Sequence, residues 1–116
     1  MPLVIYHNPR CSKSRETLAL LEAHGCTPEV IRYLETPPDV AKLQQLVNAL
    51  GFDSVRQLMR SKESLYQELG LDAPELDEAS LYAALATHPA LLERPIVVKG
   101  AQARIGRPPE RVLELL

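Results

Sequence analysis

Short apolar runs and helical repeats of apolar residues alternate along the first third of the chain. The run Leu3-Val4-Ile5-Tyr6 ends at Asn8-Pro9, a pattern typical of a buried strand that enters a turn. A helix with leucines on one side follows and ends at Gly25, and a second strand is predicted over Glu29 to Leu34. A strand, a helix and a strand in this order predict a βαβ unit with parallel strands and a right-handed crossover.

The middle of the chain carries only helical patterns. Thr36-Pro37-Pro38-Asp39 begins a helix, since proline and an acidic group both suit a first turn, and apolar residues follow at helical spacing. Shorter helices are predicted over Ser54 to Met59, Glu63 to Leu69 and Asp77 to Ala86, the last of them ending before Pro89. The chain should therefore contain an all-helical insert at about 38–92.

Strand patterns return near the end of the chain. Pro95-Ile96-Val97-Val98, a turn containing Gly100, and Ala103-Arg104-Ile105 predict a hairpin. Pro108-Pro109-Glu110 begins a final helix, whose apolar positions are expected to be Val112, Leu113 and Leu116. The complete order predicts an α/β fold over residues 1–116: a single thioredoxin-like domain in which a four-stranded mixed sheet carries the all-helical insertion.

Composition supports one compact domain and narrows the class of function. The 116 residues are 46% hydrophobic, which is enough to bury a core without a metal or disulfide. The 13 basic and 15 acidic side chains give a net charge of -2, the wrong sign for general nucleic-acid binding. No apolar run of about 20 residues and no charged leader occur, so we expect a soluble cytoplasmic protein whose two cysteines remain thiols.

The segment from His7 to Arg15 contains the residues best suited to chemistry. It places Cys11 where the first strand's turn meets the first helix, and unpaired N–H groups and the helix dipole there favour a thiolate. Positive charge from Arg10, Lys13 and Arg15 should lower the thiol pKa further. The same N–H groups can cradle an anion, so one loop can activate a nucleophile and hold an oxyanion beside it.

Simpler interpretations of these residues remain open. A cysteine at a helix start can pack as a small hydrophobic residue, and His7 beside an Asn-Pro turn is more often a structural hydrogen bonder than a catalytic group. His7 and Ser14 are nevertheless candidates to donate hydrogen bonds to the thiolate. Ser14 also replaces the second cysteine of a Cys-x-x-Cys motif. Cys26 lies fifteen residues from Cys11, about 22 Å along an intact helix, so the reducing thiol should come from another molecule.

Three arginines stand at the ends of predicted elements. Arg60 follows Leu58-Met59, Arg94 precedes Pro95 and the third strand, and Arg107 follows the fourth strand. Taken singly, each is more often a solvated or ion-paired surface group. In a thioredoxin-like fold the residues before the third strand lie near the start of the first helix, which would bring Arg94 within reach of an anion at Cys11.

Four motifs together carry a family resemblance. They are His7-Asn8-Pro9-x-Cys11, Leu58-Met59-Arg60, Glu93-Arg94-Pro95-Ile96-Val97 and Ile105-Gly106-Arg107-Pro108-Pro109-Glu110. In this order they resemble the glutaredoxin-linked arsenate reductase (ArsC-like) family, most closely its bacterial YfgD-type members, over essentially the whole chain.

The resemblance implies a site and a reaction. Cys11 would be the nucleophile, His7 and Ser14 would lower its pKa, and Arg60, Arg94 and Arg107 would bind the oxyanion, with Pro95 as a cis proline. Arsenate would form a covalent adduct on Cys11 and leave as arsenite, with glutathione as co-substrate and glutaredoxin as the partner that resolves the mixed disulfide. The implied reaction uses no bound cofactor or metal. From charge and hydropathy we expect no nucleic-acid or membrane partner, and we expect a monomer.

Two other functions fit the same fold. Ser12-Lys13 follow the cysteine where many family members carry small neutral residues, which leaves room for a glutathione-linked thiol oxidoreductase with a substrate other than arsenate. A redox-sensing regulatory module of the Spx type is the other alternative, although such a sensor is expected to use Cys-x-x-Cys.

Overall fold

The computed structural model of the protein describes residues 2–116 and divides them into two compact units. One unit comprises the chain up to Thr36 together with Arg94–Leu116, and the other is Pro37–Glu93. The second unit begins and ends within one residue of the insert predicted at 38–92. That the whole chain forms a single domain stays a prediction.

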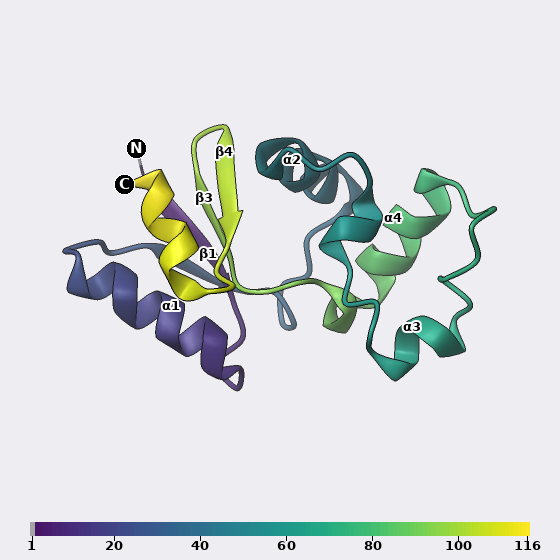
Figure 1. Ribbon diagram of the computed structural model, residues 1–116, viewed down its shortest axis with the longest axis horizontal. Helices are drawn as coiled ribbons and strands as arrows, with labels where there is room; N and C mark the ends of the chain where they lie inside the picture. Colours follow the sequence, from purple (N-terminus) through teal and green to yellow (C-terminus); the bar gives the residue numbers. More distant parts are fainter. Residues whose placement is uncertain (1) are drawn as a thin grey trace. The chain divides into compact units, whose positions relative to one another are not determined.

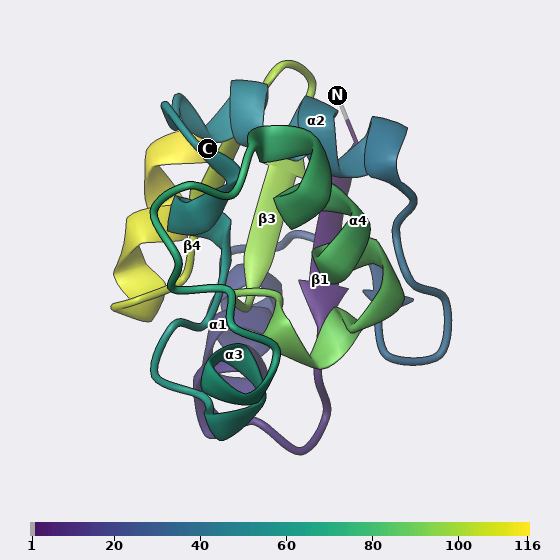
Figure 2. The ribbon, with the colours of Figure 1, turned by 90° about the vertical axis from the view of Figure 1, so that its right-hand side faces the viewer.

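A four-stranded sheet forms the centre of the first unit (Figure 1). The chain runs through β1 (Leu3–His7), α1 (Ser12–Ala23), β2 (Glu29–Arg32), β3 (Ile96–Lys99) and β4 (Gln102–Ile105), and the strands lie in the order β2-β1-β3-β4. β1 pairs parallel with β2 and antiparallel with β3, which pairs antiparallel with β4. Figure 2 shows β1 and β3 side by side in this sheet. The predicted βαβ unit, hairpin and mixed sheet are confirmed.

Alternation along β1 decides which side chains reach the core of this unit. Leu3, Ile5 and His7 share one face of the strand because successive side chains of a strand point to opposite faces. That face packs against α1 and the last helix, in a cluster of Leu3, Ile5, Leu21, Val97, Val112 and Leu115. The alternation therefore carries His7 to the side of the sheet that faces α1.

The last helix is of a different type from the other long helices. η3 (Pro109–Leu115) is a 3-10 helix, and it buries Pro109, Val112 and Leu115. Of the apolar residues named for this helix, Val112 is buried and Leu113 is half-buried, whereas Leu116 is 49% exposed and Leu115 is buried in its place. A 3-10 helix has three residues per turn, so every third side chain falls on the same face, whereas the prediction used the wider α-helical spacing.

Helices make up the second unit. They are α2 (Val40–Leu50), η1 (Val55–Leu58), α3 (Ser64–Glu68), α4 (Glu78–Thr87) and η2 (Pro89–Leu91). The segment predicted as a helix over Ser54 to Met59 is the short 3-10 helix η1. Helical structure also resumes at Pro89, where the prediction ended it, because proline is tolerated in the first turn of a helix.

Polar caps fix the starts of α2 and α4. The Asp39 side chain accepts a hydrogen bond from the Lys42 N–H at 2.8 Å, and the Asp77 side chain accepts one from the Ser80 N–H at 2.8 Å.

Within residues 2–116, no helix is long and apolar enough to cross a lipid bilayer.

Candidate active site

A tight turn delivers Cys11 to the start of α1. The Cys11 N–H donates to the Asn8 carbonyl at 3.0 Å, and Pro9 occupies the position of the turn where its fixed φ is favourable. The Asn8 side-chain oxygen accepts from the Arg10 N–H at 3.0 Å and closes the turn a second time. Cys11 then acts as the N-cap residue of α1 in extended conformation, and its carbonyl accepts the first helical hydrogen bond from Arg15 at 3.0 Å.

Opposing effects set the pKa of the Cys11 thiol. Burial of the half-exposed thiol acts to raise its pKa, but the backbone N–H groups of Ser14 and Lys13 and the charges of Arg94 and Arg107 outweigh it. The net effect lowers the pKa from its usual 9.0. The two N–H groups belong to the second and third residues of α1, which an N-cap oxygen normally satisfies. The Cys11 side chain makes no capping hydrogen bond in the structure, but a thiolate at this position is stabilised by the same two groups.

The two arginines reach Cys11 from segments distant in sequence. Arg94 precedes β3 and Arg107 follows β4, and the Arg107 Nε donates to the Arg94 carbonyl at 2.8 Å. The Arg107 Nη2 then lies 3.9 Å from the Cys11 Sγ. Both arginines precede cis peptide bonds, to Pro95 as predicted and to Pro108, which was not predicted.

Gly106 allows these two loops to meet beside Thr17 of α1. Its N–H donates to the Pro95 carbonyl at 2.9 Å. A Cβ atom at this position would lie 2.5 Å from the Thr17 Oγ1 and 2.9 Å from the Pro95 Cγ. Only glycine fits this approach without movement of α1 or of the loop, so Gly106 belongs to the support of the site. It stands in the motif of Arg107, but the sequence alone gave no reason for it.

His7 and Ser14 contact each other inside the first unit. The His7 Nδ1 and the Ser14 Oγ are 2.5 Å apart, and the Asn8 N–H donates to the same oxygen at 3.0 Å. Both side chains are buried. Ser14 therefore acts on Cys11 through its backbone N–H, while its hydroxyl holds His7 and the turn; the expectation that the two side chains donate to the thiolate stays a prediction.

His7 is held neutral by its surroundings. Burial lowers its pKa from the usual 6.5, and the charges of Arg32 and Arg15 lower it further. A neutral imidazole can both accept and donate a hydrogen bond, which suits the short contact with Ser14.

The charged neighbours of Cys11 in sequence act elsewhere. The Arg15 Nη1 donates to the Pro9 carbonyl at 3.1 Å, and the Lys13 Nζ lies 3.5 Å from a Glu16 oxygen. The prediction that Arg10, Lys13 and Arg15 supply the charge that lowers the Cys11 pKa was wrong, because Arg94 and Arg107 supply it. Lys13 and Arg15 lie on α1 and contact Glu16 and Pro9, whereas Arg107 reaches the Cys11 sulfur from the loop after β4.

The remaining candidates lie apart from this cluster. Cys26 follows the far end of α1, is half-buried and packs against the core cluster, and both cysteines are free. A helix of twelve residues is about 18 Å long, which fits the prediction that Cys26 does not pair with Cys11. Arg60 belongs to the second unit, where its guanidinium forms an ion pair with Glu63. Its part in oxyanion binding stays a prediction.

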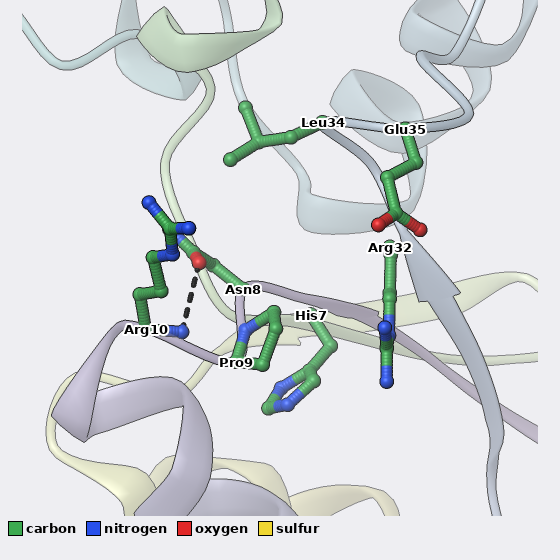
Figure 3. Close-up of a pocket in the computed structure, with 7 residues that line it drawn as sticks. All are labelled: His7, Asn8, Pro9, Arg10, Arg32, Leu34 and Glu35. Carbon is green, nitrogen blue, oxygen red and sulfur yellow. Dashed lines mark hydrogen bonds between the residues drawn. The ribbon is translucent and has the colours of Figure 1, made fainter.

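A cavity of about 230 Å³ adjoins the turn on the side of β2 (Figure 3). Its lining residues come from the turn and from the end of β2 and the segment after it: His7, Asn8, Pro9, Arg10, Arg32, Leu34 and Glu35.

Within residues 2–116, no group of three or more His, Cys, Asp or Glu side chains could hold a metal ion.

Comparison with known proteins assigns the chain to a family. It is 59% identical over 112 residues to the uncharacterized protein YfgD of Escherichia coli, covering 97% of this chain and 94% of that protein. It is 54% identical over 116 residues to the arsenate reductase of Haemophilus influenzae, covering 100% of both.

A solved structure, the arsenate reductase from Vibrio cholerae, matches with a TM-score of 0.98 at 60% identity and covers 100% of this chain and 98% of that one. Its close match agrees with the thioredoxin-like fold expected from the sequence. The ArsC family model matches residues 6–115, and this chain belongs to the ArsC family.

Proposed function

We propose that the protein is an arsenate reductase that converts arsenate to arsenite on Cys11. The observation that carries the proposal is the position of the Arg107 Nη2, 3.9 Å from a thiol whose pKa is lowered. A nucleophile and a group that binds oxyanions thus stand side by side. The full-length similarity to a relative named arsenate reductase, at 54% identity, supports arsenate as the anion.

The first step forms a bond between sulfur and arsenic. The Cys11 thiolate attacks arsenic, one As–O bond breaks, and the departing oxygen takes up a proton and leaves as water. Arsenic remains pentavalent in the adduct. Arg94 and Arg107 stabilise the negative charge on the remaining oxygens, because guanidinium groups bind such oxygens through paired hydrogen bonds.

The second step transfers two electrons from a small thiol. A glutathione thiolate attacks the Cys11 sulfur, an S–S bond forms, and the S–As bond breaks with its electron pair on arsenic. Arsenic becomes trivalent and leaves as arsenite, and Cys11 is left as a mixed disulfide with glutathione. Glutaredoxin then removes the glutathionyl group by thiol exchange. The electrons come from glutathione, so the scheme uses no bound cofactor.

A coupled assay tests this function. The protein is mixed with glutathione, glutaredoxin, glutathione reductase and NADPH, and NADPH oxidation is followed with arsenate and with a panel of other oxyanions. We expect oxidation that depends on both the protein and arsenate. Thiol exchange that proceeds equally without arsenate would contradict the proposal and favour a glutathione-linked thiol oxidoreductase.

A further inference from the structure

The cavity and the arginine pair lie on opposite flanks of β1. β1 has β2 on one side and β3 on the other, and Arg94 and Arg107 come from the β3 and β4 side. The cavity lies on the β2 side and shares its wall, Asn8 to Arg10, with the turn that ends at Cys11. A reaction on the Cys11 sulfur with two reactants needs a place for each of them. The arginine pair lies on one flank of β1, and the cavity, which borders the turn before Cys11, lies on the other.

Charged groups line this cavity without partners of their own. Within the described residues of the first unit, the side chains of Arg10, Arg32 and Glu35 make no hydrogen bond or ion pair. Figure 3 shows the Arg10 guanidinium and the Glu35 carboxylate on opposite sides of the view, with Leu34 and Pro9 between them. The cavity lining therefore combines apolar side chains with two cations and one anion.

We infer that this cavity binds the small thiol that reduces the Cys11 adduct, a peptide-like thiol with two carboxylates and one ammonium group. Arg10 and Arg32 bind the carboxylates, Glu35 binds the ammonium group, and Leu34 and Pro9 contact the carbon chain. Glutathione has this set of charges. The inference rests on the proposed function only in naming the reaction, since the charge pattern is a property of the cavity itself.

Binding here directs the thiol at the sulfur from the side away from the arginines. The thiolate attacks the Cys11 sulfur, an S–S bond forms, and the S–As bond breaks with its electrons on arsenic. Arg94 and Arg107 keep their contact with the arsenic oxygens during this step. A second binding site separate from the oxyanion site lets both reactants be bound at once, which raises their effective concentration.

Direct binding tests the site without any reaction. S-methylglutathione, which has no free thiol, is titrated into the Cys11→Ser protein and followed by calorimetry. We expect saturable binding with one molecule per chain, and a dissociation constant roughly tenfold higher in Arg10→Gln and in Arg32→Gln, because each loses a charged hydrogen bond. The matched control is Arg111→Gln, an exposed arginine of η3 that should leave the constant unchanged.

The Glu35 contact has its own readout. Glu35→Gln should weaken S-methylglutathione and leave unchanged the glutaryl analogue, in which the amino group is replaced by hydrogen. A merely structural role for Glu35 would weaken both ligands equally, and that result would contradict the assignment.

Steady-state kinetics connects the site to the reaction. Arg10→Gln and Arg32→Gln should raise KM for glutathione by roughly tenfold and leave KM for arsenate and for 2-mercaptoethanol, an uncharged thiol, unchanged. Equal binding of S-methylglutathione by the variants and the parent protein would overturn the inference. Absence of arsenate turnover would instead overturn the proposed function, while the calorimetry would still decide on the cavity.

Discussion

Cys11 combines the geometry of a helix cap with the chemistry of a nucleophile. A serine or aspartate in its place would use its oxygen to satisfy the N–H groups at the start of α1. A thiol is a better hydrogen-bond acceptor when it is ionised. The unpaired N–H groups at the start of the helix therefore stabilise the thiolate over the thiol. Burial works against ionisation, and the N–H groups at the start of α1 together with the charges of Arg94 and Arg107 outweigh it.

The reactivity of Cys11 tests this balance of effects. In a Cys26→Ser background, the rate of alkylation by iodoacetamide should rise with pH around a midpoint below 9.0, the usual thiol value. Arg107→Gln should move the midpoint upward because it removes a positive charge 3.9 Å from the sulfur. Arg111→Gln, at an exposed position in η3, is the control. A midpoint that does not move in Arg107→Gln would show that the helix start alone lowers the pKa.

Burial of neutral His7 makes stability depend on pH. Its pKa is lowered in the folded state, so below the usual 6.5 the unfolded chain binds a proton at His7 that the folded chain does not. The free energy of unfolding should therefore fall as the pH falls below about 6.5, and should be insensitive to His7 above it. Urea denaturation between pH 5.5 and 7.5 measures this slope, and His7→Gln should reduce it. An equal slope in the two proteins would mean that His7 titrates normally.

The sequence predicted where Cys11 lies, but not which positive charges lie beside it. The position of Cys11 follows from local signals, a strand, an Asn-Pro turn and a helix, and these signals identified it. The source of its positive charge did not follow from local signals. Lys13 and Arg15 are near in sequence, yet Arg107, ninety-six residues away, lies against the sulfur. Which of several cations faces a thiol is decided by loop packing, and no local pattern encodes it.

At the scale of elements, η3 shows how helix type changes a prediction. Proline at the start and apolar residues after it predicted a helix correctly, but both an α-helix and a 3-10 helix satisfy that pattern. The three-residue period that buries Leu115 in place of Leu116 arises from contacts with α1 and β4, which lie elsewhere in the sequence.

Alanine substitutions in η3 distinguish the two periods. Leu115→Ala should lower the free energy of unfolding by about 2–5 kcal/mol, the range for a buried leucine. Leu116→Ala should change it by less than about 0.5 kcal/mol, since that side chain is 49% exposed. Urea denaturation of the two variants provides a matched pair. A larger loss in Leu116→Ala would indicate an α-helical end to the chain.

Gly106 couples β4, the cis-proline loop and α1. In Gly106→Ala the new methyl group would lie 2.5 Å from the Thr17 Oγ1, so either the loop or the helix must move. Overpacking of this kind should cost about 1–3 kcal/mol in the free energy of unfolding. Because Arg107 is the next residue, displacement of the loop should also raise the Cys11 pKa, which iodoacetamide alkylation measures.

A second substitution tests whether the clash is the cause. Thr17→Ala removes the Oγ1 and Cγ2 atoms that an added Cβ at Gly106 would meet at 2.5 and 3.0 Å. The double variant should therefore recover part of the stability lost in Gly106→Ala, beyond the sum of the single effects. Additive losses would show that Gly106 matters for a reason other than its approach to α1.

In the whole molecule, the helical unit is inserted between β2 and β3 of the unit that contains the sheet and Cys11. The chain leaves the sheet after β2, forms the helical unit Pro37–Glu93, and returns at Arg94 to complete the sheet and the site. The pattern of the sequence predicted this division because strand patterns give way to helical spacing at the first boundary and return at the second. It did not predict the cavity beside Asn8-Pro9, since that space depends on how the segment after β2 passes the turn.

For the chain as a whole, we expect Cys11 to be the one protein thiol that reacts in each catalytic cycle. Cys11 and Cys26 stand at opposite ends of α1, so an internal disulfide cannot form and the mixed disulfide must wait for an external thiol. After reaction with arsenate and glutathione, without glutaredoxin, intact mass spectrometry should find one glutathione per chain, on Cys11. Cys26→Ser should retain both this adduct and arsenate reduction, and Cys11→Ser should lose both, because a hydroxyl is a far weaker nucleophile at neutral pH. An internal disulfide, or loss of turnover in Cys26→Ser, would mean that α1 opens during the reaction and brings its two ends together.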